Sequence, residues 1–319
     1  MGMTIFSNTA LPITLGVIGM IILLILITSY ICYSMIFKRE KKKSNEQYPL
    51  PDGKEYLTYK DELISIMKYV DDLPYKEASI TSFDGLKLYG RYYECDSNAP
   101  IEILFHGYKG DSRRDLSGGV IRCFNVNHNV LLVDHRASGR SEGKVTTFGV
   151  NESQDCLKWI DYILQNINKD ARIILSGVSM GAATVLIAAS LNLPKNVIGV
   201  LADCGYTSTK AIIKKVIKEM HLSADLLFPF VKLGALLFGH FKVDTYCPIE
   251  SVKNAKVPIL YYHGDNDLFV PYEMSVENFK ATKSMSKMVT IKNAGHGLCF
   301  LIDKEKYIKE LNDFFDKLK

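Results

Sequence analysis

The sequence predicts an α/β protein, with a mostly parallel sheet flanked by helices and one membrane-spanning helix before it. Three observations lead to this fold class. Residues 11–37 contain no charged side chain. From residue 101 onward, short apolar runs alternate with helical patterns, which is typical of a parallel sheet covered on both faces. Residues 173–184 (IILSGVSMGAAT) combine an apolar strand, a tight turn and a helix of small residues.

The apolar run of residues 11–37 is long enough to cross a bilayer. Its 27 residues would form a helix of about 40 Å, longer than the hydrocarbon core of about 30 Å. A cleaved signal peptide is the alternative. No Lys or Arg precedes the run and no A-x-A site follows it, so we expect an uncleaved anchor.

A basic cluster, residues 38–43 (KREKKK), follows the apolar run directly. Its charge of +4 equals the formal net charge of the whole chain, so the remainder is neutral and does not predict nucleic-acid binding. The positive-inside rule places the cluster beside anionic lipid head groups in the cytoplasm, together with the domain that follows. Met1-Gly2 would suit N-myristoylation, but Phe6 stands where that motif needs Ser or Thr.

The cysteines predict neither a metal site nor a disulfide framework. All seven are scattered along the chain without a CxxC pair. Scattered thiols suit a reducing compartment, which agrees with the charge rule. We therefore expect no metal and no cofactor.

Residues 38–74 are expected to join the anchor to the folded domain. Residues 44–54 (SNEQYPLPDGK) are polar, with two prolines and a glycine, and are interpreted as a linker. Residues 55–70 place their apolar side chains on one helical face. We expect this amphipathic helix to pack on the folded domain rather than to lie on the membrane surface.

The folded domain is expected to cover residues 75–319. Its first two strands are interpreted as a hairpin around Phe83-Asp84-Gly85, and the later strands as parallel. The expected strands are residues 79–81, 86–93, 101–105, 130–133, 173–175, 197–202, 259–262 and 288–291, with helices over 151–167 and 182–191 and from residues 271 and 303.

Residues 205–249 interrupt the alternation of strands and helices. This segment is apolar and helical in pattern, and it separates two strands by far more than a usual connection. We interpret it as a cap that gives an active site an apolar wall, because sites are often built from insertions at strand ends. Additional core is the alternative.

The stretch of residues 173–184 predicts a serine nucleophile. Strand, sharp turn and helix form the context in which G-x-S-x-G makes a nucleophile elbow at Ser179. We expect glycine at 177 and 181 because larger side chains would clash with the adjoining strand and helix. The hydroxyl of Ser179 would stand above a helix N-terminus, where negative charge is favoured.

A serine hydroxyl needs a general base, and the base needs an orienting acid. His296 is the predicted base, because glycines on both sides and a position after the last expected strand let it reach the elbow. His106, His135 and His263 lie at or just past strand ends, and we interpret them as loop-shaping residues.

Asp267 is the predicted acid, since it follows the strand at residues 259–262. Asp265 is the near alternative and is interpreted as a turn-former, and Asp203 after the preceding strand is a second alternative. The order Ser179, Asp267, His296 is the order expected of such a fold.

The backbone N–H groups of Met180 and Tyr108 would stabilise an oxyanion. Gly107 would permit the turn that points the N–H of Tyr108 toward the oxyanion.

Six motifs in this order resemble the α/β-hydrolase superfamily: HGYKGD, DHRASGRSEG, GVSMG, DCGYTS, HGDND and NAGHG. The closest resemblance is to bacterial hydrolases of the serine aminopeptidase-like or monoglyceride-lipase-like branch, over about residues 75–319. The resemblance implies an α/β-hydrolase fold with a helical cap. It also implies a nucleophile at Ser179, a base at His296, an acid at Asp267 and oxyanion N–H groups at Tyr108 and Met180.

The sequence as a whole predicts a membrane-anchored serine hydrolase that cleaves carboxylic esters, with acyl lipids as candidate substrates. The expected partners are a small ester or acyl substrate and the lipid bilayer, with no nucleic acid. A serine peptidase of the same fold is one alternative, since the fold hosts many chemistries. A non-catalytic tethered binding module is the other, although such a module would usually have lost one of the three triad residues.

Overall fold

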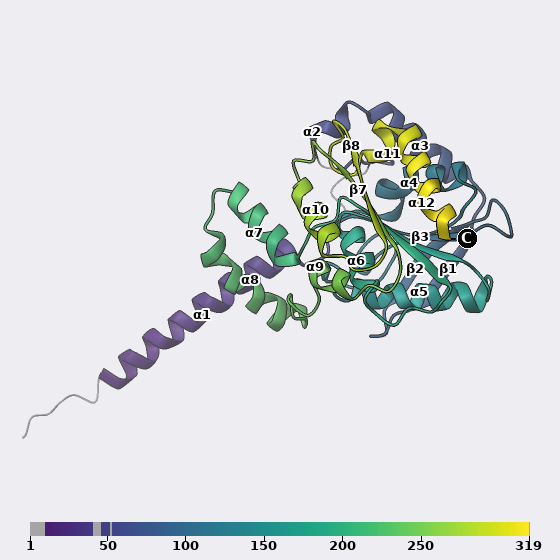
Figure 1. Ribbon diagram of the computed structural model, residues 1–319. Helices are drawn as coiled ribbons and strands as arrows, with labels where there is room; N and C mark the ends of the chain where they lie inside the picture. Colours follow the sequence, from purple (N-terminus) through teal and green to yellow (C-terminus); the bar gives the residue numbers. More distant parts are fainter. Residues whose placement is uncertain (1–9, 41–45, 52, 319) are drawn as a thin grey trace, which may run out of the picture. The chain divides into compact units, whose positions relative to one another are not determined.

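The computed structural model describes residues 10–40, 46–51 and 53–318 (Figure 1). The chain divides into two compact units. The smaller unit contains Met1–Lys38 and Lys214–Lys242, and the larger contains Arg39–Ile213 and Val243–Lys319. The boundary between them falls within α7 (Thr209–Glu219).

The larger unit is built on an eight-stranded sheet in the order β1-β2-β4-β3-β5-β6-β7-β8. β1 and β2 are antiparallel to their neighbours, and β3 to β8 run parallel to one another, so the predicted fold class is confirmed. The strands are β1 (Lys76–Thr81), β2 (Lys87–Tyr93), β3 (Ile101–Phe105), β4 (Asn129–Val133), β5 (Ile173–Val178), β6 (Val197–Asp203), β7 (Ile259–Gly264) and β8 (Ser286–Ile291).

Helices cover both faces of this sheet (Figure 1). Successive strand residues point to opposite faces. Ile103 packs in the cluster that includes Trp159 of α5, whereas Leu104 packs with Val120 of α4. The helices of this unit are α2 (Lys54–Leu57), α3 (Lys60–Asp72), α4 (Ser112–Asn125), α5 (Glu152–Asn166), α6 (Met180–Ala188), α9 (Pro248–Ser251), α10 (Tyr272–Ala281), α11 (Cys299–Ile302) and α12 (Lys304–Phe315), with 3₁₀ turns at Val252–Asn254 and Asp316–Leu318.

A buried ion pair joins β3 to α4. The guanidinium of Arg122 donates to both carboxylate oxygens of Glu102, over 3.0 and 2.7 Å. His128 Nδ1 lies 2.7 Å from the same carboxylate. Burial alone would oppose the charge of Glu102, but Arg122 and His128 hold the pKa of its carboxyl well below the ordinary value.

The segment after the apolar helix is packed against the sheet domain. The expected single helix over 55–70 is two helices, α2 and α3, and α3 packs on α4 with Met67 and Val70 buried. Packing on the folded domain is therefore confirmed. Arg39 donates to the carbonyl oxygens of Gly139 and Ser141, and it lies in the described part of the basic cluster. The predicted charges at 41–43 lie outside the described residues, as do Met1, Gly2 and Phe6.

The smaller unit pairs α1 (Ala10–Ile36) with α8 (Ala224–Gly239). The two helices approach closely at Gly234, where a Cβ would clash with the carbonyl oxygen of Ser29. The rings of Tyr30 and Phe238 meet edge to face at 5.2 Å.

Residues 11–36 have the length and composition of a membrane span. A signal sequence near the N-terminus can have the same length and composition. The helical character expected of residues 205–249 is present, and their role as a cap stays a prediction.

Candidate active site

Ser179 occupies a strained turn between β5 and α6. Its φ of 57° and ψ of −114° lie in a region that side-chain-bearing residues rarely adopt. A Cβ at Gly177 would clash with the backbone of residues 181 and 182, and a Cβ at Gly181 would clash with the carbonyl of Phe105. The steric reason expected for the two glycines is therefore present. The N–H of Ser179 donates to the carbonyl of Asp203 over 2.9 Å, which ties the turn to the end of β6.

Asp267 and His296 meet although 29 residues separate them. His296 Nδ1 lies 2.7 Å from Asp267 Oδ2. The other carboxylate oxygen, Oδ1, accepts from the backbone N–H groups of Phe269 and Val270 at 2.9 and 2.8 Å. Burial opposes the charge of Asp267, but the hydrogen bonds from His263 and His296 bring the pKa of its carboxyl well below the ordinary value. Asp267 is therefore ionised at neutral pH and orients the imidazole.

His263 is a second histidine on the same carboxylate. Its Nε2 lies 3.1 Å from Asp267 Oδ2 and 2.9 Å from the Val270 carbonyl, while its Nδ1 lies 2.7 Å from Ser275 Oγ. Two acceptors around Nε2 place the proton there. The sequence interpretation as a loop-shaping residue missed this contact with the acid, and a histidine four residues before an aspartate is too weak a signal to reveal it.

The acid loop and the histidine loop are tied together by their backbones. Asp265 Oδ1 accepts from the N–H of Asn293 over 2.6 Å, and the N–H of Asn266 donates to the carbonyl of Ala294 over 3.1 Å. A Cβ at Gly264 would clash with that same carbonyl. Asp265 lies in the turn after β7, as expected, and its carboxylate also holds the neighbouring loop that carries His296.

Asp203, the second alternative for the acid, makes a different contact. Its Oδ2 accepts from the hydroxyl of Tyr307 at 3.2 Å, and among the described residues its Oδ1 has no hydrogen-bond partner. Burial raises the pKa of this carboxyl. The geometry therefore favours Asp267 as the partner of the histidine.

The loop after β3 lies beside Ser179. A Cβ on Gly107 would stand 3.6 Å from Ser179 Cβ and 4.0 Å from its Oγ. The N–H of Gly107 donates to Asp115 Oδ2 at 3.1 Å, and Tyr108 follows with its ring 4.8 Å from that of Phe148. Met180 opens α6 directly after Ser179. Met180 is thus adjacent to the serine and Tyr108 follows Gly107 in the neighbouring loop, and the role of their N–H groups as an oxyanion pair stays a prediction.

His106 and His135 shape the same loop, as the sequence suggested. The N–H of His135 donates to His106 Nε2 over 3.0 Å, so the proton of His106 is on Nδ1, which donates to the carbonyl of Gly107 over 2.8 Å. Both rings are buried and meet at 4.5 Å. These histidines support the backbone of the loop beside Ser179.

A family model described as the alpha/beta hydrolase fold matches residues 103–225. This chain has the α/β-hydrolase fold. A solved structure of the Pyrococcus furiosus esterase Pf2001 superposes with a TM-score of 0.61 at 24% identity, covering 85% of this chain and 97% of that one. At such identity the likeness establishes the fold, and the narrower branch named above stays a prediction.

Two curated relatives of this α/β hydrolase have low identity. The Bacillus subtilis protein YqkD is 24% identical over 191 residues, which are 60% of this chain and 63% of YqkD. The Schizosaccharomyces pombe protein bem46 is 24% identical over 197 residues, which are 61% of this chain and 60% of bem46. The match thus spans about three fifths of each relative's length.

The structure also places the thiol of Cys204 beside the Asp267–His296 pair. Donor atoms of these three residues all lie within 4.8 Å of one another, a spacing that could hold a metal ion. The hydrogen bond between Asp267 and His296 already joins two of the three donors. Burial raises the pKa of the Cys204 thiol, which opposes the thiolate that metals prefer. These features do not favour metal binding by the cluster.

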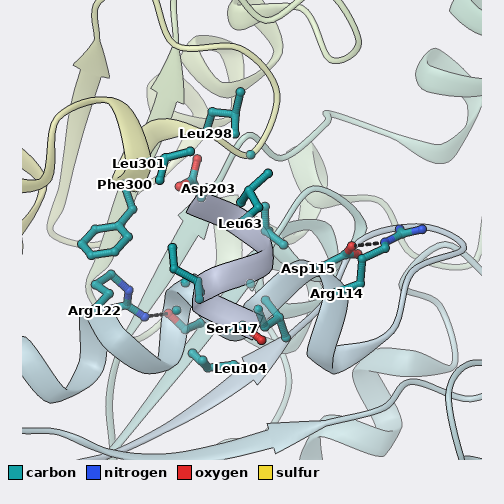
Figure 2. Close-up of a pocket in the computed structure, with 18 of the residues that line it drawn as sticks. Leu63, Leu104, Arg114, Asp115, Ser117, Arg122, Asp203, Leu298, Phe300 and Leu301 are labelled. Carbon is teal, nitrogen blue, oxygen red and sulfur yellow. Dashed lines mark hydrogen bonds and ion pairs between the residues drawn. The ribbon is translucent and has the colours of Figure 1, made fainter. Parts of the chain in front are cut away.

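A cavity of about 110 Å³ lies behind the elbow of the hydrolase (Figure 2). Its walls are mostly apolar, with Leu63 of α3, Leu104 of β3 and Leu298 labelled in Figure 2. Asp203 supplies a buried carboxyl to the same cavity. Val178 and Gly297 line it, whereas their neighbours Ser179 and His296 do not, so this space adjoins the candidate catalytic residues without being lined by them.

Proposed function

We propose that this α/β hydrolase is a membrane-anchored serine hydrolase that cleaves carboxylic esters through an acyl-enzyme. One observation carries the proposal: Ser179 stands on a strained, glycine-flanked turn, and His296, whose neighbour Gly297 lies against Val178, is hydrogen-bonded to buried Asp267. A strained serine and a carboxylate-oriented histidine are the two parts from which a serine hydroxyl is activated for attack.

In the proposed reaction Ser179 Oγ forms a bond to the ester carbonyl carbon while its proton passes to His296 Nε2. Nε2 takes this role because Nδ1 is engaged with Asp267. The N–H groups of Tyr108 and Met180 stabilise the oxyanion, each donor being worth about 10²- to 10³-fold in rate. The bond to the alcohol oxygen then breaks, and His296 returns its proton to the alcohol. Water repeats the sequence on the acyl-enzyme and releases the acid.

Apolar surface supports acyl esters as the substrate class. Within the smaller unit, α8 packs on α1 and still exposes Leu226, Leu236 and Leu237. Large exposed apolar patches mark membrane or ligand contacts. The solved neighbours include esterases, Pf2001 and an Exiguobacterium antarcticum enzyme among them, which favours esters by analogy of fold alone.

The test is covalent labelling by a fluorophosphonate probe, combined with turnover of p-nitrophenyl esters of increasing acyl length and of aminoacyl amides. We expect Ser179 to be labelled and esters to be preferred over amides. Ser179→Ala should lower kcat by about 10⁶-fold with little change in melting temperature, because it removes only the nucleophile.

Two results would contradict this proposal. Near wild-type turnover by Ser179→Ala would show that Ser179 is not the nucleophile. No labelling of well-folded wild-type protein would favour a binding module. A preference for aminoacyl amides would instead move the proposal to the peptidase alternative.

A further inference from the structure

Tyr56 of α2 reaches the backbone of the catalytic histidine loop. Its hydroxyl donates to the carbonyl oxygen of His296 over 2.8 Å, across 240 residues of sequence. The side chain is only 7% exposed, so this hydrogen bond is shielded from water. Tyr56 precedes both the first strand of the sheet and the region matched by the family model.

The Tyr56 hydroxyl lies near residues of the candidate active site. Burial raises the pKa of this phenol strongly, and the nearby groups Cys204, Asp115 and Asp267 raise it further. The hydroxyl therefore stays protonated and remains a donor at neutral pH. The neighbouring Glu55 also packs against the loop, since its Cγ would lie 3.6 Å from a Cβ on Gly295.

His296 is consequently held at two points. Asp267 holds the imidazole through Nδ1, and Tyr56 holds the backbone carbonyl of the same residue. Glycines flank His296 on both sides, and Gly297 has a φ of 66°, so the local chain does little by itself to fix the ring. A small displacement of a catalytic group can cost a large factor in rate.

The helix that follows keeps Tyr56 in place. α3 packs on α4, and Met67 and Val70 are buried beneath it. Lys304 Nζ lies 2.7 Å from Glu62 of α3, so α3 lies beside the start of α12, which follows the histidine loop. Through α2 and α3, the segment that follows the apolar helix contacts the loop that carries His296.

We propose that Tyr56 is a positioning residue for His296, so that residues 53–72 complete the active site of the hydrolase. The inference rests on the proposed function. Without the Tyr56 hydroxyl the histidine loop samples more conformations, and a smaller fraction of the enzyme holds the imidazole ready for proton transfer. Acylation slows, while substrate binding, which does not involve this hydroxyl, is unchanged.

The experiment compares Tyr56→Phe with a matched control, Tyr262→Phe. Each variant keeps the ring and removes one buried hydroxyl that donates to a backbone carbonyl, over 2.8 Å to His296 and over 2.7 Å to Tyr307. Tyr262 lies in the core of β7 and touches no reacting group. Fluorophosphonate labelling rate, kcat and KM for a short-chain ester, melting temperature and hydrogen exchange of residues 293–299 are measured for each variant.

We expect Tyr56→Phe to lower kcat and the labelling rate by about three- to tenfold, the scale of one net hydrogen bond, with KM within about twofold. Hydrogen exchange over residues 293–299 should rise in this variant alone. Both variants should lower the melting temperature by similar amounts. Unchanged exchange or an unchanged labelling rate in Tyr56→Phe overturns the inference, as does equal slowing in the control.

The two proposals fail in different ways. If wild-type protein is not labelled at Ser179, the proposed function fails, and hydrogen exchange still decides whether Tyr56 holds the loop. If wild type is labelled and Tyr56→Phe is labelled as fast, the function stands and the positioning role falls.

Discussion

The carboxylate of Asp267 accepts four hydrogen bonds. Oδ2 lies against His296 and His263, and Oδ1 accepts from two backbone N–H groups of its own loop. Four donors outweigh the cost of burial, so the carboxylate stays charged. A charged acceptor keeps the proton of His296 on Nδ1 and leaves Nε2 as the nitrogen that accepts the proton of Ser179 in the proposed reaction.

Replacing Asp267 by Asn should therefore lower kcat by about 10⁴-fold while the protein stays folded, because the amide favours the wrong imidazole tautomer. Asp265→Asn and Asp203→Asn should cost much less, since each variant keeps an oxygen that can accept the existing hydrogen bond, from Asn293 or from Tyr307. The kcat of the three variants on one ester decides the assignment. A larger loss in Asp203→Asn than in Asp267→Asn would move the acid to β6.

The residues that sequence could find are those with a local signature. Ser179 lies in a five-residue motif, and Asp267 and His296 follow it in the expected order after recognisable strands. Contacts between residues far apart in the sequence have no local pattern that could predict them. Asp265 was interpreted from its own turn, yet its partner is 28 residues away. Tyr56 is 240 residues from His296 and lies in the expected amphipathic helix of residues 55–70, whose pattern predicts packing on the domain but does not identify the partner.

At the scale of elements, strands were easier to predict than helices. The parallel strands are continuous apolar runs, and β3, β4 and β7 are buried at every position. The sequence does not predict α4, because Gly118, Gly119 and several charged residues interrupt the helical spacing of its apolar side chains. The structure explains the second glycine, since a Cβ at Gly119 would stand 3.0 Å from Leu104 Cδ1.

The ion pair between β3 and α4 predicts a dependence of stability on pH. Glu102 has a pKa below its ordinary value of 4.5 in the folded protein, so its contribution is present above about pH 4.5 and is lost as the pH falls through the folded pKa. Glu102→Gln should destabilise the fold by about 3–5 kcal/mol at pH 7, because Arg122 is left buried without its partner. The difference from wild type should shrink below pH 4.5.

Thermal or urea unfolding at several pH values checks this dependence. Glu62→Gln is the matched control, since it removes a carboxylate from the pair with Lys304, whose side chains are 44% and 47% exposed. Pairs this exposed contribute little, so the control should stay close to wild type at every pH. An equally large loss in Glu102→Gln at pH 7 and at pH 3.5 would contradict the assigned role.

For the whole molecule, sequence predicted the apolar helix and its bounds within one residue, because a long uncharged run is unmistakable. It did not predict that α8 packs on this helix. Both segments are apolar almost throughout, and an apolar surface does not by itself specify its partner. The close approach at Gly234 and the rings of Tyr30, Tyr33 and Phe238 provide that specificity only once the chain is folded.

Orientation in the membrane is the remaining prediction, and the charges beside α1 decide it. Five of the six residues at 38–43 are basic, whereas residues 1–10 contain no charged side chain. Lys and Arg next to a span are retained on the cytoplasmic side, so the hydrolase domain should lie in the cytoplasm. A C-terminal reporter that works only in the cytoplasm should be active, and one that needs export should be silent.

Retention of an N-terminal tag on the mature protein separates an anchor from a cleaved signal. Replacing Lys41, Lys42 and Lys43 by Gln should weaken the preference, with Lys317→Gln at the far end of the chain as the control. Activity of the exported reporter in the wild type would reverse the topology.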